Sequence, residues 1–71
     1  RACEAVYAAV REPIEATLLA YGLDGESARR RATAVVASLE GGLVLSYTLR
    51  DVGPLEAVGE MLEVMLAQRN P

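Results

Sequence analysis

Apolar residues recur along the first third of the chain at intervals of three and four positions, which is the spacing of one face of an α-helix. This pattern predicts a first helix from Ala2 to about Tyr21. Its apolar stripe consists of Cys3, Val6, Tyr7, Val10, Ile14, Leu18 and Tyr21. Glu4, Arg11 and Glu15 fall outside this stripe, so we expect them on the exposed surface of the helix.

Proline, glycine and aspartate mark where helices break, end and begin. Pro13 lies inside the first apolar pattern, and because it lacks a backbone N–H it predicts a kink or a break there. Gly22 is suited to the position that follows a helix. Asp24 is a good N-cap for a second helix, which continues to about Arg50 and would be roughly 38 Å long at the usual rise per residue.

A third helix is predicted from Pro54, a residue favoured at the first helical position, to about Gln68. The linker at residues 51–53 is short, so the second and third helices should be antiparallel neighbours. No segment alternates apolar and polar residues with the period of a β-strand. The sequence therefore predicts an all-α fold of three antiparallel-packed helices.

The second helix has two apolar faces. One face is suited to a core of its own and consists of Ala28, Ala32, Val35, Val36, Leu39, Leu43 and Tyr47. The opposite face should be charged in a helix exposed on that side, but it consists of Ala34, Ala37, Gly41, Val44, Leu45 and Thr48. A helix that is apolar all round is buried all round, and 71 residues cannot bury both faces internally. We therefore expect the second face, which is rich in small residues, to contact another chain.

The third helix repeats this excess of apolar surface. A wide apolar arc contains Leu55, Val58, Met61, Leu62, Met65 and Leu66, beside a narrow polar strip of Glu56, Glu60 and Glu63. We predict that the last two helices form a four-helix bundle with the same helices of a second subunit. The predicted interface consists of Ala34, Ala37, Gly41, Val44, Leu45 and Thr48 of the second helix and Val58, Leu62 and Met65 of the third.

Composition leaves few other ways to stabilise so short a chain. Cys3 is the only cysteine and there is no histidine, which excludes an internal disulfide and argues against a metal site or other cofactor. Cys3 itself is expected as a small buried apolar residue. Glu40 and two glycines interrupt the longest weakly charged run, which argues against a membrane span. Because the chain starts at Arg1 inside an amphipathic pattern, we expect it to be a piece of a longer protein.

Charge argues against a direct role in nucleic-acid binding or catalysis. The net charge is −3, whereas contact with phosphates needs a basic face. The one basic cluster, residues 29–31, is better explained as the solvated first turn of the second helix, balanced by Glu26. No histidine base, Ser-His or Cys-His pair, or glycine-rich phosphate loop is present, so we do not expect an enzyme.

Several short motifs occur in an order that is less common than helical patterning itself. An alanine-rich helix carries the run Leu39-Glu-Gly-Gly-Leu43, and Arg50-Asp51 and Pro54-Leu55 follow it. Together these motifs resemble the last two helices of TetR-family transcriptional regulators, and they are most similar to the LmrA/YxaF-like subgroup. The first helix, which ends in Leu18-Leu-Ala-Tyr-Gly22, resembles the preceding helix of the same domain.

The resemblance implies that residues 1–71 form the C-terminal regulatory domain of a cytoplasmic bacterial regulator, which we expect to be a repressor. It implies a homodimer built on the last two helices and a small apolar or aromatic effector bound among the middle helices. Operator DNA would be contacted only through an N-terminal helix-turn-helix domain, which this sequence does not contain. No membrane partner and no cofactor are implied.

The candidate effector-binding residues are Tyr7, Val10, Ile14, Leu39 and Glu40. A tyrosine combines an apolar ring with a hydroxyl group, as the walls of pockets often do, but burial in the core explains it as well. Glu40 is the one acid in an apolar stretch. It is a polar contact at the effector or the interface, or a structural acid that is paired with an arginine or exposed in a groove.

Two functions remain open at this point. One is a regulatory domain that dimerises and senses an effector, and the other is a helical dimerisation or interaction module that binds no ligand. A helix-turn-helix roughly 100 residues upstream of the Glu40 region in the parent chain would favour the first.

Overall fold

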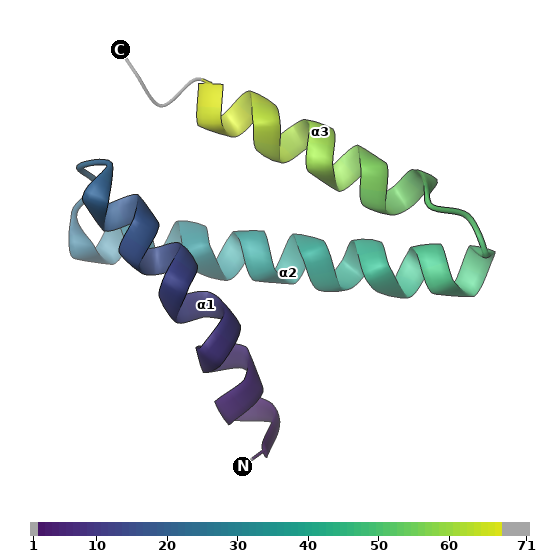
Figure 1. Cartoon of the computed structure of the whole chain (residues 1–71), viewed down its shortest axis with the longest axis horizontal. Helices are drawn as coiled ribbons and strands as arrows, with labels where there is room; N and C mark the ends of the chain where they lie inside the picture. The colour runs from purple at the N-terminus through teal and green to yellow at the C-terminus, as the bar shows by residue number, and fades with distance from the viewer. Residues whose placement is uncertain (1, 68–71) are drawn as a thin grey trace. The chain divides into compact units, whose positions relative to one another are not determined.

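The computed structural model describes residues 2–67, except the side chains of residues 2, 3 and 66, and it contains three α-helices (Figure 1). Helix α1 spans Ala2–Ala20, α2 spans Gly25–Leu49 and α3 spans Gly53–Ala67. No residue in this range belongs to a strand, so the predicted all-α fold is confirmed. The predicted helix end at Gln68 lies outside the described residues.

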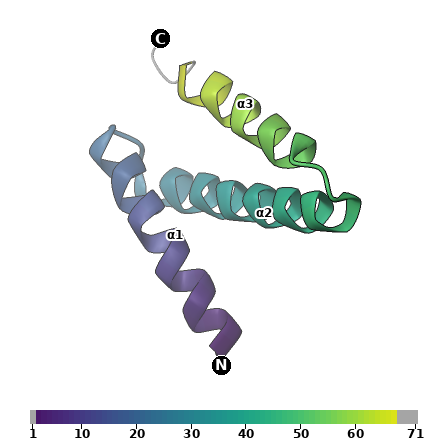
Figure 2. The ribbon, with the colours of Figure 1, turned by 45° about the vertical axis from the view of Figure 1, so that its right-hand side comes forward.

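The chain divides into two compact units, Arg1–Val36 and Ala37–Pro71, and α2 passes from one into the other. In the first unit α1 leads through a tight turn into the N-terminal part of α2. In the second unit α3 runs back in the opposite direction from the C-terminal part of α2, as Figure 2 shows. The antiparallel arrangement that was predicted for α2 and α3 is thus present within this unit.

α1 ends in a hydrogen-bonding pattern that depends on a glycine. Gly22 has a φ of 102°, in the left-handed region that favours glycine. Its N–H donates to the carbonyl of Leu19 at 3.0 Å, and the N–H of Leu23 donates to the carbonyl of Leu18 at 3.3 Å. These two bonds form a Schellman motif, which satisfies carbonyls that the helix itself leaves unpaired. The predicted helix end at Gly22 is confirmed.

α1 continues through Pro13 without interruption, so the predicted break is absent. Proline removes the bond that would reach the carbonyl of Ala9, but both residues are exposed and water can satisfy that carbonyl. The hydroxyl of Thr17 donates to the carbonyl of Pro13 at 3.0 Å. An exposed proline is therefore accommodated within one helix.

Asp24 caps α2 as predicted. Its Oδ1 accepts a hydrogen bond from the backbone N–H of Ser27 at 2.8 Å, and its Oδ2 accepts one from the Ser27 hydroxyl at 3.3 Å. The backbone hydrogen bond from Ser27 is the main reason why the pKa of the Asp24 carboxyl lies below its usual value of 3.8. The ionised form of this cap is therefore the favoured one in the folded chain.

α2 ends in a second Schellman motif, in which a non-glycine residue takes the left-handed position. Arg50 has a φ of 52°. Its N–H donates to the carbonyl of Tyr47 at 3.3 Å, and the N–H of Asp51 donates to the carbonyl of Ser46 at 3.0 Å. The left-handed conformation costs an L-residue with a side chain about 1–2 kcal/mol. The turn between α2 and α3 is therefore held by its hydrogen bonds against the preference of Arg50.

The first unit buries only small and medium-sized apolar side chains. Ala28 and Ala32 are fully buried and Val36 nearly so, as predicted, while Tyr7 and Ile14 of α1 are half-buried. The predicted stripe of α1 is only partly confirmed, because Val6, Val10 and Tyr21 are exposed. The side chain of Cys3 lies outside the described part of the chain.

The second unit corrects the predicted core face of α2. Leu43 is 56% and Tyr47 is 87% exposed, whereas Gly42 is buried and Leu39 and Ser46 are half-buried. The prediction for Leu43 and Tyr47 was wrong because the face of α2 that meets α3 uses the small residues beside them. Small side chains allow the two backbones to approach each other closely.

Replacement of Arg50 by glycine should stabilise the fold. Glycine adopts the left-handed conformation freely, so Arg50→Gly should raise the free energy of unfolding by about 1 kcal/mol. Urea denaturation of the purified protein measures this. Gly22→Ala, at the equivalent position of α1, should lower the same quantity by about 1 kcal/mol. Changes of the same sign at both positions would contradict the explanation.

The cap at Asp24 should make stability depend on pH. Its folded pKa is lowered, so the ionised carboxyl stabilises the fold above the unfolded pKa, and this contribution is lost as the pH falls through the folded pKa. Asparagine caps a helix about as well but does not ionise. The melting temperature of wild type should therefore rise relative to that of Asp24→Asn as the pH is raised from about 3 to about 7. A difference that is constant over this range would refute the role of the charge.

Candidate functional site

Close contact between α2 and α3 depends on the absence of a side chain at Gly42. A Cβ atom at this position would lie 3.1 Å from Cγ2 of Val58 and 3.3 Å from Cδ1 of Leu55. Both distances are tighter than ordinary van der Waals contact. By contrast, a Cβ at Gly41 would meet nothing within 4 Å in the described part of the chain. The two adjacent glycines therefore differ: Gly42 serves the contact within the chain, and Gly41 lies on a free face.

The first four backbone N–H positions of α3 are all accounted for. The N–H of Gly53 donates to Oδ1 of Asp51 at 3.0 Å, and Pro54 has no N–H. The N–H of Leu55 donates to the hydroxyl oxygen of Ser46 on α2 at 3.1 Å, and that of Glu56 donates to the carbonyl of Val52 at 2.9 Å. Helix N-termini need such partners. Here one of them is a side chain from the neighbouring helix, which fixes where α3 begins.

Every residue of the predicted interface on α2 is exposed. Val44 is 63% and Leu45 is 53% exposed, and the remaining members are Ala34, Ala37, Gly41 and Thr48. Val58, Leu62 and Met65, the predicted interface residues of α3, are half-buried. The structure therefore leaves the α2 part of this surface uncovered, while Val58 contributes to contact with α2.

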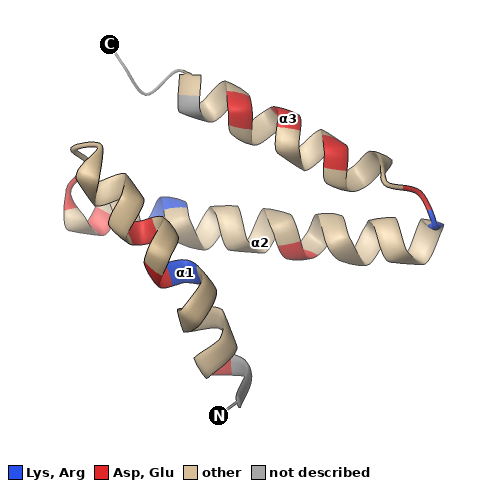
Figure 3. Ribbon diagram, viewed as in Figure 1, with Lys and Arg blue, Asp and Glu red and all other residues tan. Residues whose placement is uncertain are grey.

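Charge is nearly absent from this part of α2. Between residues 32 and 49 only Glu40 is charged, and Figure 3 shows one red band in the middle of α2 with tan helix on both sides of it. An 18-residue window of α2 reaches a mean hydropathy of 1.4, so by length and composition alone this helix is apolar enough to cross a membrane. Core helices of soluble proteins meet the same criterion. The basic cluster at the start of α2 is partly balanced, because Arg30 lies 3.8 Å from Glu26.

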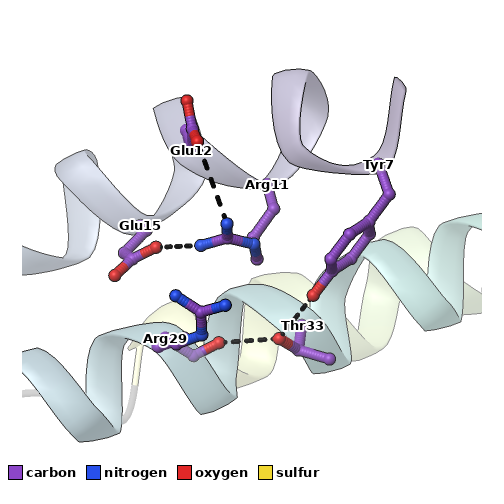
Figure 4. Close-up of polar contacts among 6 residues, drawn as sticks. All are labelled: Tyr7, Arg11, Glu12, Glu15, Arg29 and Thr33. Atoms are coloured by element: carbon purple, nitrogen blue, oxygen red, sulfur yellow. Dashed lines mark hydrogen bonds and ion pairs between the residues drawn. The ribbon is translucent and has the colours of Figure 1, made fainter. Parts of the chain in front are cut away.

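A polar cluster joins α1 to α2 within the first unit (Figure 4). The hydroxyls of Tyr7 and Thr33 are 2.9 Å apart. The Thr33 hydroxyl also donates to the carbonyl of Arg29 at 2.9 Å. Because threonine has a single hydroxyl proton, Tyr7 must be the donor in its bond with Thr33. This chain of two hydrogen bonds connects the tyrosine ring to the backbone of α2.

Arg11 lies at the centre of this cluster and is only 6% exposed. Its guanidinium pairs with Glu15 one turn ahead and lies 3.9 Å from Glu12. It also lies over the ring of Tyr7, 5.4 Å from the ring centre, in cation–π geometry. Its buried Nε has no hydrogen-bond partner among the described residues. A buried donor without a partner costs about 1–3 kcal/mol, so this position is energetically unusual.

Arg11 is the functional candidate that the sequence analysis missed, because it was placed on the exposed surface. The signal was present: positions 7, 11, 14 and 18 are separated by four, three and four residues, which is also the spacing of one helix face. Tyr7 one turn before and Glu15 one turn after are suitable neighbours for a buried arginine. Only the charge of the Arg11 side chain indicated that it would be exposed to solvent.

The predicted effector residues fall into both units. Tyr7 and Ile14 are half-buried on α1 and Val10 is exposed, so these three line one side of the helix together with Arg11. Leu39 and Glu40 belong to the second unit, where Leu39 is half-buried and Glu40 is exposed. Tyr7, Val10 and Ile14 thus share one side of α1, and the effector-binding role of all five residues stays a prediction.

Other chemistry has little support in the described residues. They contain no group of three histidine, cysteine, aspartate or glutamate side chains that could hold a metal ion. An open depression lies at the turn between α2 and α3, lined by Ser46, Tyr47, Arg50, Asp51 and Val52. These residues form helix ends and caps. The depression lacks the enclosed apolar walls that are typical of ligand sites.

Comparison with known protein families gives a match over most of the chain. Residues 1–61 match the model of the C-terminal domain of LmrA/YxaF-like transcriptional regulators. No curated protein and no solved structure gives a significant match. The matched range contains α1, α2 and the first half of α3, and with them the Gly42 contact and the Tyr7–Arg11 cluster.

Removal of the Ser46 hydroxyl should weaken the start of α3. Ser46→Ala leaves the half-buried N–H of Leu55 without its acceptor, so the free energy of unfolding should fall by about 1 kcal/mol. Ser38→Ala is a matched control, because it makes the same change on α2 where no described hydrogen bond of the side chain is lost. Urea denaturation of both variants measures the difference. Equal effects of the two substitutions would show that Ser46 does not act as a cap.

Proposed function

The chain belongs to the LmrA/YxaF-like family of TetR-type transcriptional regulators, as their C-terminal domain, and from this we propose that it holds two subunits together and forms part of an effector pocket. The proposed protein is a homodimeric regulator, most simply a repressor, that works in the cytoplasm of a bacterium. Operator DNA is contacted by an N-terminal domain outside residues 1–71. This role requires no catalysis and no cofactor.

The observation that carries the proposal is the uncovered apolar face of α2. Gly41 has open space around it, and Val44 and Leu45 are more than half exposed. Isolated apolar residues are common on protein surfaces, but a continuous uncharged helix face indicates an interaction site. Small residues at its centre allow another helix to approach closely. The same face of a second copy, related by a two-fold axis, is both apolar and rich in small residues, so the two faces can bury each other and approach closely.

The charged strip of α3 gives this interface an edge. Glu56, Glu60 and Glu63 are all exposed, and Figure 3 shows acidic bands along this helix. Depletion of charge at the centre and polar residues at the rim are typical of protein interfaces. We therefore assign the face with Ala37 and Gly41 to the partner subunit and the glutamates to solvent.

The proposed effector pocket uses the side of α1 that carries Tyr7, Val10 and Ile14, which its own unit covers only in part. Val10 is exposed and Ile14 and Tyr7 are half-buried, so apolar surface is available for a small aromatic or apolar compound. Leu39 and Glu40 are further candidates. A module that dimerises without binding a ligand would have no need of the buried, incompletely bonded Arg11, and this favours the sensing role.

Ala37→Glu should break the dimer. The substitution places a carboxylate opposite its own symmetry mate, and repulsion with desolvation should cost several kcal/mol per dimer. Sedimentation equilibrium on the intact regulator measures the dissociation constant. Glu56→Gln and Glu60→Gln are the controls, and each should change association by no more than about 0.5 kcal/mol.

The outcome of this test also locates the interface. If Ala37→Glu remains fully dimeric at low micromolar concentration, the predicted face is wrong. Gly41→Leu should act in the same direction as Ala37→Glu, since overpacking typically costs 1–3 kcal/mol. Loss of dimerisation in a glutamate-to-glutamine control would place the interface on the polar strip instead.

A further inference from the structure

The Nε atom of Arg11 is a buried donor that its surroundings leave unused. The side chain is 7% exposed, and its two terminal nitrogens face Glu15 and Glu12. The Nε N–H has no acceptor among the described residues. Buried donors are normally paired, so a specific exception calls for an explanation, and a ligand acceptor is one that would fit a sensing domain.

The surroundings of Arg11 favour a neutral aromatic ligand. The Arg11 guanidinium faces two carboxylates, which gives these three side chains a net charge of −1, and the Arg29 side chain of α2 is turned toward the same cluster in Figure 4. A carboxylate ligand would meet repulsion from both glutamates, and Glu15 already occupies one terminal nitrogen. A neutral oxygen acceptor meets no such penalty. Tyr7, whose ring lies against the guanidinium, supplies an aromatic wall beside the donor.

Small side chains make up most of the core that joins α1 to α2 in this unit. The buried apolar residues of α2 here are Ala28, Ala32 and Val36, and the bond between Tyr7 and Thr33 joins the two helices. Two of these three apolar side chains are alanines, which bury little area, so a shift of α1 past them loses little apolar surface. A small displacement of α1 can therefore open the Nε atom to a ligand at modest cost.

Resting on the proposed effector-sensing function, we propose that Arg11 selects the effector. Its Nε donates a hydrogen bond to a neutral acceptor, such as a carbonyl oxygen, on a small aromatic compound. The apolar side chains of Tyr7, Val10 and Ile14 hold the ring of that compound. Arg11 thereby discriminates against hydrocarbons, which leave the donor unpaired, and against carboxylates, which the two glutamates repel.

Three probes of the same size test this on the full-length regulator by isothermal titration calorimetry. They are 2-acetonaphthone, with a ketone; 2-isopropenylnaphthalene, its hydrocarbon isostere; and 2-naphthoate, with a carboxylate. Wild type should bind the ketone about tenfold more tightly than the hydrocarbon, as expected for one hydrogen bond to a charged group. The carboxylate should bind more weakly than the ketone.

Two variants remove the donor in different ways. Arg11→Lys keeps the charge but has no donor at the Nε position, and Arg11→Met also removes the charge, so either one that retains the wild-type circular dichroism is informative. In both, the ratio between ketone and hydrocarbon should fall to near one. Arg30→Lys is the matched control on an exposed arginine and should keep the wild-type ratio.

The wild-type measurement decides the proposal even if neither variant folds. Equal affinity for ketone and hydrocarbon, or tightest binding of the carboxylate, overturns the role of Arg11 and leaves the proposed effector pocket standing. A wild-type ratio that persists in a folded Arg11 variant overturns it as well. If none of the probes binds, the proposed effector pocket itself is wrong, whereas the dimer test above is unaffected.

Discussion

Contact through small residues on α2 is the constraint on which the rest of the structure depends. In the first unit Ala28 and Ala32 are the fully buried positions, and in the second Gly42 leaves room for Leu55 and Val58. Such contacts bring backbones together but bury little apolar area, and burial of area supplies most of the stability of a fold. Several of the larger apolar side chains of α2, among them Leu43, Val44, Leu45 and Tyr47, are left exposed.

This arrangement explains why α2 has the hydropathy of a membrane helix although it belongs to a regulator domain. A helix whose inward positions are alanine and glycine must carry its larger apolar residues, such as Val44, Leu45 and Tyr47, elsewhere. We propose that other parts of the protein or a second subunit bury those residues. The small buried apolar area and the large exposed apolar area therefore have the same cause. We expect such a domain to be stabilised by association with other parts of the protein or with a second subunit.

The thin contact in the first unit also gives polar groups a larger role than usual. Tyr7 and Thr33 hold α1 to α2 by a hydrogen bond, and Arg11 is buried with one donor unpaired. Polar networks that are incompletely satisfied are unfavourable in a static core. They are useful in an element that must respond to a ligand, because a ligand that completes the network shifts the balance between arrangements.

The sequence alone determined the three helices, their caps at Gly22 and Asp24, and the family. These follow from local rules: backbone conformation, capping and periodic spacing depend on neighbours in the chain. The first helix was predicted to include Pro13, but the effect of this proline on helix continuity was overestimated, because the cost of a missing donor depends on whether water reaches the freed carbonyl.

Only the tertiary structure decided which side of α2 faces α3 and where Arg11 lies. When a helix is apolar on every side, its pattern does not show which face contacts the next helix. In α2 the alternatives were the face with Gly42 and Ser46 and the face with Leu43 and Tyr47. The distance to which α3 can approach each face decides between them. The burial of Arg11 likewise depends on partners supplied by packing, namely Glu15 and the ring of Tyr7, that compensate its charge. The local sequence pattern determines which secondary structure a segment forms, whereas the shape complementarity between segments determines which of its faces is buried.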